Sequence, residues 1–320
     1  MRAIVITENG GPEVLVIGEP PVPEPGPGEV LIDVAAAGVN FIDVYFRTGA
    51  YPRTPPYTPG MEAAGTVAAV GEGVTEFSVG DRVASANVTG AYAEKAIAAA
   101  DRVVPVPDGV GLDDAAAALL QGMTAHYLTR STYPIQEGDT VLVHAAAGGM
   151  GLLLTQTAKA LGATVLATAS TPEKEKLAKD AGADVTMGYD GFADRVRELT
   201  GGTGVAAVYD GVGAPTFEGS LASLRPRGML ALYGAAGGKV PPFDPQRLNA
   251  GGSLFLTRPT LAHYVAARDE LLERAADVYR WVESGDLNVH VGRRYDLAEA
   301  GAAHTDLEGR RTTGKLLLIP

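Results

Sequence analysis

The sequence VLVHAAAGGMGLLLTQ occupies residues 141–156 and decides the fold of the chain. Its first residues have the apolar character of a buried strand, and its last residues are typical of a helix start. Between them, residues 145–151 contain only alanine, glycine and one methionine, so backbone N–H groups and the positive end of the helix dipole can approach two phosphates. The pattern is Gly-x-Gly-x-x-Gly with Ala146 at the first glycine, and it predicts a dinucleotide site. The alternative is an ordinary tight strand-to-helix turn.

Further short apolar segments follow this stretch and alternate with segments of helical spacing. The predicted strands are residues 164–169, 185–187, 205–209, 229–233 and 253–257. The predicted helices are residues 170–181, 192–199 and 216–224. Six strands in this alternation predict an α/β fold with a Rossmann-type, doubly wound parallel sheet, and we expect strand 253–257 at one edge of it.

The end of the second strand carries no carboxylate, although an NAD-selective site places an Asp or Glu there. Residues 168–171 read TAST, and Lys174 lies one turn into the next helix. A lysine can supply positive charge to a 2′-phosphate, so this region favours NADP over NAD. The alternative is that Lys174 only pairs with Glu173 and Glu175 on a solvated helix.

Composition indicates a cytoplasmic enzyme of two domains. The chain has 320 residues, is 46% hydrophobic and 20% charged, and has a formal net charge of −12. That charge opposes nucleic-acid or anionic-membrane binding, and no apolar run reaches the roughly 18 residues of a membrane span. The N-terminal residues 1–7 are predicted to form a strand rather than a signal peptide.

Metal chemistry is not expected, because the chain contains no cysteine and its five histidines show no i, i+3 or i, i+4 pairing. Thiolate catalysis and disulfides are excluded for the same reason. His144 directly precedes the glycine-rich turn, and we interpret it as a buried residue rather than an acid–base group.

The first 120 residues form short strands broken by Pro and Gly, which predict a small, mostly antiparallel β domain. The predicted strands are residues 3–7, 14–17, 30–39, 65–71, 81–86, 91–97 and 102–104. After the sheet we predict a long helix at 261–283, a strand near 289–291, a helix near 297–307 and a strand at 316–319. We expect this tail to rejoin the first domain. The predicted domains are therefore 1–120 with 261–320, and 121–260, with a cleft between them.

Several motifs along the whole chain together carry a family resemblance. They are AGVNFID (37–43), YP (51–52), GMEAAG (60–65), VGDRV (79–83), GAY (90–92), QGMTA (121–125), HAAAGGMG (144–151), YDGVG (209–213) and TRP (257–259). With these motifs the chain resembles the zinc-independent quinone oxidoreductases of the medium-chain dehydrogenase/reductase superfamily. The resemblance implies that the β domain is GroES-like.

The chain departs from the zinc-dependent relatives at both sets of metal ligands. Those enzymes carry a Cys near position 37 or 38 and Gly-His-Glu where this chain has Gly60-Met61-Glu62. Without a Lewis acid to stabilise an alkoxide, alcohol oxidation loses its main electrophile. Hydride delivery to an electron-poor acceptor, a quinone or an enone, is the easier reaction.

The resemblance also implies site residues, all within an NADPH-binding site. The residues bordering the nicotinamide and the acceptor pocket, and the catalytic candidates, would be Asn40, Asp43, Tyr45 and Tyr51. The pyrophosphate would be lined by Thr124, Ala147, Gly148, Gly149 and Met150. The 2′-phosphate would be held by Ser170, Lys174, Tyr189 and Arg310. The nicotinamide end would pack against Tyr233, Gly234, Phe255, Leu256 and Thr257.

We therefore expect NADPH-dependent quinone reduction without a metal, with Tyr51 or Asn40 donating a hydrogen bond to the acceptor oxygen as negative charge develops there. One alternative is an enoyl-thioester or alkenal reductase of the same fold. A second is a non-catalytic, crystallin-like NADPH-binding protein. The apolar edge strand 253–257 and the resemblance both predict a homodimer.

Overall fold

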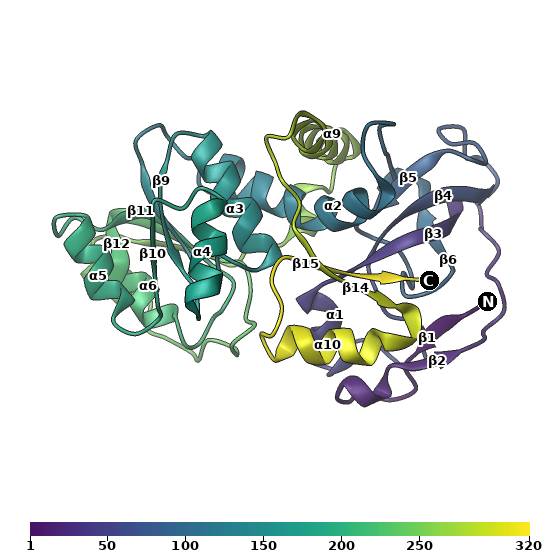
Figure 1. Cartoon of the computed structure of the whole chain (residues 1–320), viewed down its shortest axis with the longest axis horizontal. Helices are drawn as coiled ribbons and strands as arrows, with labels where there is room; N and C mark the ends of the chain where they lie inside the picture. The colour runs from purple at the N-terminus through teal and green to yellow at the C-terminus, as the bar shows by residue number, and fades with distance from the viewer. The chain divides into compact units, whose positions relative to one another are not determined.

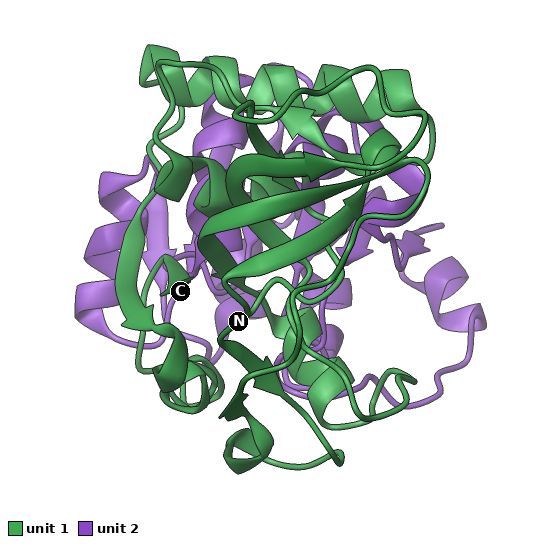
Figure 2. Cartoon of the chain, turned by 90° about the vertical axis from the view of Figure 1, so that its right-hand side faces the viewer, with its two compact units in different colours: residues 1–123, 265–320 green, residues 124–264 purple.

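The computed structural model describes residues 1–320, which form two compact units (Figures 1 and 2). Unit 1 comprises residues 1–123 and 265–320, and unit 2 comprises residues 124–264. None of the helices combines the length and apolar character that crossing a bilayer requires.

Unit 2 contains a six-stranded sheet in which every neighbouring pair of strands is parallel. Its strands are β8 (Thr140–Val143), β9 (Thr164–Thr168), β10 (Val185–Met187), β11 (Val205–Asp210), β12 (Leu224–Leu232) and β13 (Phe255–Thr257). The order β10-β9-β8-β11-β12-β13 confirms the predicted Rossmann sheet, with β13 at an edge. Successive strands are added in one direction from β8 to β10 and in the opposite direction from β11 to β13, so the strand order switches between β8 and β11. Ligands of such sheets bind at the carboxyl ends of the strands at this switch point.

Helices cover both faces of this sheet. They are α3 (Gly149–Ala160), α4 (Pro172–Asp180), α5 (Phe192–Leu199), α6 (Phe217–Ser223), α7 (Gln246–Ala250) and α8 (Leu261–Tyr264). Figure 1 shows α3 and α4 on one face and α5 and α6 on the other. Leu142, Val208 and Leu230 from the strands pack with Val196 and Phe217 from the helices in one buried core.

Unit 1 is built on a mostly antiparallel sheet, as predicted. Its strands are β1 (Ala3–Val5), β2 (Val16–Gly18), β3 (Glu29–Val39), β4 (Glu62–Val70), β5 (Arg82–Ser85), β6 (Lys95–Ala99), β7 (Val104–Pro105), β14 (Val291–Asp296) and β15 (Lys315–Ile319). Helices α1 (Phe41–Arg47), α9 (Arg268–Ser284) and α10 (Ala300–Glu308) accompany them, and α2 (Leu112–Tyr127) ends in a π-helical turn, Leu128–Thr132. β15 pairs antiparallel with β3, so the C-terminal tail rejoins the N-terminal sheet as expected.

Some predicted elements were wrong. The helix expected at 261–283 is interrupted between α8 and α9, because the Arg102 guanidinium binds the carbonyl oxygens of Val265 and Ala266 at 2.8 and 3.1 Å. The strand expected at 14–17 is β2, which begins only at Val16. Residues Pro12–Val14 form a 3-10 turn instead, since proline at its first position favours a helical start. Helices α1 and α2 were not predicted at all.

Two further strands lie later in the chain than expected. The strand predicted at 91–97 is β6, because the amides of Ala91 and Tyr92 instead donate to the loop carbonyls of Gly60 and Pro59. The strand predicted near 289–291 is β14, which begins at Val291 where pairing with β15 begins.

Candidate functional site

A turn without side-chain caps joins β8 to α3. Gly148 precedes the helix in an extended conformation and offers no capping side chain. The amides of the first helical turn therefore have no acceptor within the helix. A Cβ on Gly151 would lie 2.3 Å from the Ala145 oxygen and 2.5 Å from the Ala146 Cα, so the helix start packs directly on the turn. Backbone donors without an acceptor at the positive end of a helix fit a pyrophosphate. The predicted residues in this turn and first helical turn are Ala147, Gly148, Gly149 and Met150.

Three of the predicted 2′-phosphate residues lie near the carboxyl ends of β9 and β10, the strands beyond β8. Ser170 follows β9, and Lys174 lies in the first turn of α4, where its amide donates to the capping Thr171 hydroxyl at 3.3 Å. Tyr189 follows β10, and its hydroxyl oxygen accepts from the Ala145 amide at 3.1 Å. The Tyr189 hydroxyl proton therefore stays available to a ligand. The fourth predicted residue, Arg310, belongs to unit 1 and follows α10.

His144 is fully buried beneath the turn, as expected. Its Nδ1 lies 2.8 Å from Thr168 Oγ1, and its Nε2 lies 3.0 Å from Ser220 Oγ. Ser220 donates its single hydroxyl proton to Asp210 Oδ2 at 2.8 Å, so its oxygen accepts from a protonated Nε2 and Nδ1 accepts from Thr168. Burial lowers the pKa of His144 to about 4. The neutral imidazole thus ties together the carboxyl ends of β8, β9 and β11.

The other predicted cofactor residues of unit 2 lie farther along the same sheet. The amides of Tyr233 and Gly234, after β12, donate to the Asp210 carbonyl at 2.9 and 3.3 Å. A Cβ on Gly211 would lie 2.7 Å from the Tyr233 ring, so these two loops are closely packed. The residues of the edge strand β13 are Phe255, Leu256 and Thr257, and Thr124 is a buried residue of α2.

A buried ion pair lies at the start of α1 in unit 1. Lys315 Nζ is 2.6 Å from Glu62 Oε2 and 2.7 Å from Asn40 Oδ1, and both charged residues are at most 1% exposed. Asn40 Nδ2 donates to Glu62 Oε2 at 2.8 Å and to the Gly38 carbonyl at 3.2 Å. The Leu120 amide donates to Glu62 Oε1 at 2.7 Å. Both Nδ2 hydrogens of Asn40 are therefore used, which corrects the expectation that Asn40 donates to an acceptor oxygen.

Asp43 lies one helical turn beyond Asn40 and is also buried. Its Oδ2 accepts from the Asn40 amide at 3.0 Å and from the Tyr92 hydroxyl at 2.9 Å. Burial raises the pKa of Asp43 to about 6. With its side chain 1% exposed, Asp43 fixes the first turn of α1 from inside.

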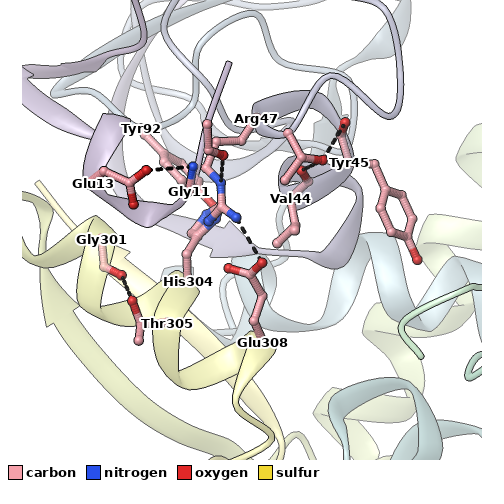
Figure 3. Close-up of polar contacts among 12 residues, drawn as sticks. Gly11, Glu13, Val44, Tyr45, Arg47, Tyr92, Gly301, His304, Thr305 and Glu308 are labelled. Atoms are coloured by element: carbon pink, nitrogen blue, oxygen red, sulfur yellow. Dashed lines mark hydrogen bonds and ion pairs between the residues drawn. The ribbon is translucent and has the colours of Figure 1, made fainter. Parts of the chain in front are cut away.

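A hydrogen-bonded chain continues from Tyr92 to the surface (Figure 3). Tyr92 Oη lies 3.1 Å from His304 Nε2, and His304 Nδ1 lies 3.1 Å from Arg47 Nη1. Because Tyr92 gives its only proton to Asp43, His304 donates from Nε2 and accepts from Arg47 at Nδ1. Arg47 also pairs with Glu308 at 2.8 Å. The chain therefore joins α1 to α10, and its hydrogen bonds from Arg47 through His304 and Tyr92 all point toward Asp43.

Tyr45 and Tyr51 belong to a group of rings on and beside α1. Figure 3 shows Tyr45 pointing away from Arg47 and His304. Its ring centroid is 5.2 Å from that of Tyr51, and the Tyr51 ring contacts Phe46 edge-on at 5.7 Å. The Tyr51 amide donates to the Tyr45 carbonyl at 2.9 Å. We call Phe41, Tyr45, Phe46 and Tyr51 the aromatic group; Phe41 lies 6.3 Å from Tyr45.

Comparison with known proteins agrees with this architecture. A family model described as a zinc-binding dehydrogenase matches residues 149–277, and one described as an alcohol dehydrogenase GroES-like domain matches residues 26–108. A quinone oxidoreductase of Pseudomonas aeruginosa is 46% identical over 100% of this chain and 99% of its own. The chain belongs to the quinone oxidoreductases of the medium-chain dehydrogenase/reductase superfamily.

Two further proteins are similar to this chain over their full length. A 2-haloacrylate reductase of a Burkholderia species is 44% identical, covering 100% of this chain and 99% of the relative. A mycobacterial protein solved in complex with NADPH is 58% identical, with a TM-score of 0.98 and complete coverage of both chains.

This family member has no group of three or more His, Cys, Asp and Glu side chains placed to hold a metal ion. Met61 stands where zinc-dependent relatives have histidine, and the oxygens of the neighbouring Glu62 bind Lys315, Asn40 and the Leu120 amide. The cation beside this carboxylate is therefore an amino group of the chain itself.

Sequence reasoning missed most of the unit 1 network of this family member. It singled out Asn40 and Asp43 but not their buried partners, which are Arg47, Glu62, Tyr92, His304 and Lys315. The one available signal was a charged residue in an apolar strand, Lys315 at the head of KLLLI. Buried charges are rare unless they are paired.

His304→Gln is expected to reduce the loss of folding stability that occurs when the pH is lowered. Burial, and then the Arg47 charge, lower the pKa of His304 to about 3 from its ordinary 6.5. This contribution to stability is complete above pH 6.5 and is lost as the pH falls toward 3, on the order of 5 kcal/mol in all. Glutamine can accept from Arg47 and donate to Tyr92 without titrating.

Urea unfolding of the wild type and of His304→Gln at pH 7 and pH 5 measures this effect. We expect the free energy of unfolding to fall less in the variant. The raised pKa of Asp43, about 6, acts in the opposite sense, adding stability as the pH falls through 6, and it is present in both proteins. Equal falls in the two proteins would contradict the assignment of His304.

Proposed function

We propose that this chain reduces quinones with NADPH as the reductant and without a metal ion. The observation that carries the proposal is the cap-free turn between β8 and α3, which leaves backbone donors at the switch point of the sheet. Relatives named quinone oxidoreductase and a neighbour solved with NADPH support it.

The roles proposed for the side chains rest on the family resemblance. Amides at the start of α3 hold the pyrophosphate, which Thr124, Ala147, Gly148, Gly149 and Met150 line. Ser170, Lys174, Tyr189 and Arg310 bind the 2′-phosphate, and Tyr233, Gly234 and residues 255–257 pack against the nicotinamide end. The bound cofactor supplies a hydride to the acceptor.

The residues of unit 1 orient the acceptor. Tyr51 donates its hydroxyl proton in a hydrogen bond to the acceptor oxygen as negative charge develops there. Tyr45 packs against the Tyr51 ring and holds its orientation. Asn40 and Asp43 act as positioning residues, because their side chains fix the first turn of α1 through Lys315 and Tyr92. Holding the acceptor in one orientation supplies most of the acceleration.

Reduction of an activated double bond is the second candidate function. The Burkholderia relative named 2-haloacrylate reductase favours this reaction over NADPH binding without turnover. An enoyl-thioester or alkenal reductase would need the same cofactor site. A crystallin-like protein would bind NADPH without oxidising it.

Steady-state NADPH oxidation by chelator-treated, dialysed protein separates these functions. The acceptors are 1,4-benzoquinone, crotonyl-CoA, an alkenal and 2-chloroacrylate. We expect benzoquinone to give the highest kcat/KM. A higher value with any of the alkenes would favour double-bond reduction, and NADPH binding without oxidation would favour the crystallin-like role.

Arg310→Ala is expected to weaken NADPH binding about tenfold or more and to leave NADH binding nearly unchanged. A charge-assisted contact to a phosphate contributes roughly 1.5–3 kcal/mol, and only NADPH carries the 2′-phosphate. Fluorescence titration with both cofactors measures the two affinities. Arg311→Ala is the matched control, because Arg311 pairs with Asp306 at 2.7 Å. Equal losses for both cofactors would defeat the assignment.

A homodimer formed through β13 completes the proposal. The strand ends the sheet, and Phe255 on it is 55% exposed. Antiparallel pairing with the same strand of a second copy would satisfy the free backbone edge. Light scattering at micromolar concentration is expected to give twice the 33.0 kDa chain mass, and a monomer would contradict the proposal. The cytoplasmic location remains a prediction.

A further inference from the structure

Arg53 holds its guanidinium against two aromatic rings at the border of the aromatic group. Its Cζ lies 4.5 Å from the centroid of the Tyr57 ring and 5.8 Å from that of the Phe46 ring. Phe46 is also the ring that Tyr51 contacts at 5.7 Å. The guanidinium and Tyr51, the proposed hydrogen-bond donor to the acceptor, therefore both contact the same phenyl ring.

The guanidinium of Arg53 has no anionic partner in the chain. It forms no hydrogen bond or ion pair, and the residue is half-buried. Rings attract a cation through their faces, but they leave the N–H donors at the edge of the guanidinium unused. Those five donors match a carboxylate or sulfonate better than any uncharged group.

The neighbouring charges do not neutralise Arg53. The charged groups that act on Tyr57, besides Arg53, are Asp43 and Arg47. Asp43 is bound to the Tyr92 hydroxyl and the Asn40 amide, and Arg47 to His304 and Glu308. The positive charge of Arg53 thus remains available at this face of unit 1.

We propose that Arg53 binds an anionic substituent of the acceptor, a carboxylate or sulfonate on a quinone or on an activated alkene. The substituent would lie on the guanidinium while the reacting part of the molecule lies against Tyr51. This inference rests on the proposed function, and it names the acceptor class that the site prefers. With a formal net charge of −12, the chain as a whole repels anions, so their selective use requires a local cation of this kind.

A matched pair of acceptors tests the proposal, 1,2-naphthoquinone and 1,2-naphthoquinone-4-sulfonate. For Arg53→Gln we expect kcat/KM for the sulfonate to fall about tenfold more than kcat/KM for the parent quinone. Arg53→Lys should recover part of that difference, because the charge remains but the planar fork is lost. Arg2→Gln removes the same charge from an exposed pair with Glu94 in unit 1 and should change both acceptors equally.

The outcomes separate this inference from the proposed function. If the wild type oxidises NADPH with neither quinone, the proposed function fails. If it uses both, and Arg53→Gln changes them by the same factor, only the role of Arg53 is overturned. A selective rise in the KM for NADPH would assign the guanidinium to the cofactor and would also overturn it. Thermal unfolding of each variant checks that the fold is retained.

Discussion

Lys315→Met is expected to lower the free energy of unfolding by about 3–5 kcal/mol, the cost of leaving a buried charge unpaired. Glu62 is 0% exposed, and Lys315 is its only cationic partner. The substitution also removes the donor to Asn40 Oδ1, so the first turn of α1 loses a fixed contact. Urea unfolding at pH 7 measures the change.

Two further variants show whether burial causes this loss. Lys95→Met breaks an ion pair with Asp33 in which the lysine side chain is 32% exposed and the aspartate side chain 49% exposed. We expect this substitution to lower the free energy of unfolding by less than about 1 kcal/mol. Combining Lys315→Met with Glu62→Gln removes both buried charges and should recover at least half of the loss. A small effect of Lys315→Met alone would show that Glu62 is not held by this pair.

Gly151→Ala is expected to weaken NADPH binding by more than tenfold and to destabilise unit 2 by about 1–3 kcal/mol, as overpacking does. The added Cβ would meet backbone atoms of Ala145 and Ala146 at 2.3 and 2.5 Å, and backbone cannot turn aside as a flexible side chain can. The start of α3 would have to move away from the turn, taking its amides with it. Cofactor titration and thermal unfolding measure the two effects.

Gly188→Ala is the matched control for this prediction. It lies in the same unit, and a Cβ there would meet nothing within 4 Å. We expect it to change neither stability nor affinity appreciably. Equal behaviour of the two variants would show that close packing at Gly151 does not shape the phosphate site.

The sheet of unit 2 could be predicted because each of its strands is locally encoded. Buried parallel strands are continuous apolar runs, and the residues of β11 are all buried. The position of β13 at the edge followed from strand order alone. The β8–α3 turn was also recognisable, because its chemistry resides in the backbone of consecutive residues.

The network of unit 1 could not be predicted, because its partners are far apart in the sequence. Arg47 and His304 are separated by 257 residues, and Lys315 and Glu62 by 253. No local periodicity encodes such pairs. The break between α8 and α9 has the same origin, since Arg102 acts on carbonyls more than 160 residues away.

Helix α1 was missed for a different reason. Its capping box uses Asn40 and Asp43 in place of the more familiar Ser or Thr with Glu. Its seven residues also give too short a window for helical spacing to stand out from the surrounding strands.

The central claim is that this chain passes a hydride from NADPH to a quinone without a metal ion. The most direct test mixes chelator-treated protein, preloaded with NADPH, with 1,4-benzoquinone under anaerobic conditions in a single turnover, and follows the absorbance of the reduced nicotinamide. We predict that one NADPH is oxidised for each hydroquinone formed, more slowly when deuterium replaces the transferred hydrogen. Unoxidised NADPH, or oxidation only after zinc is added, would contradict the account.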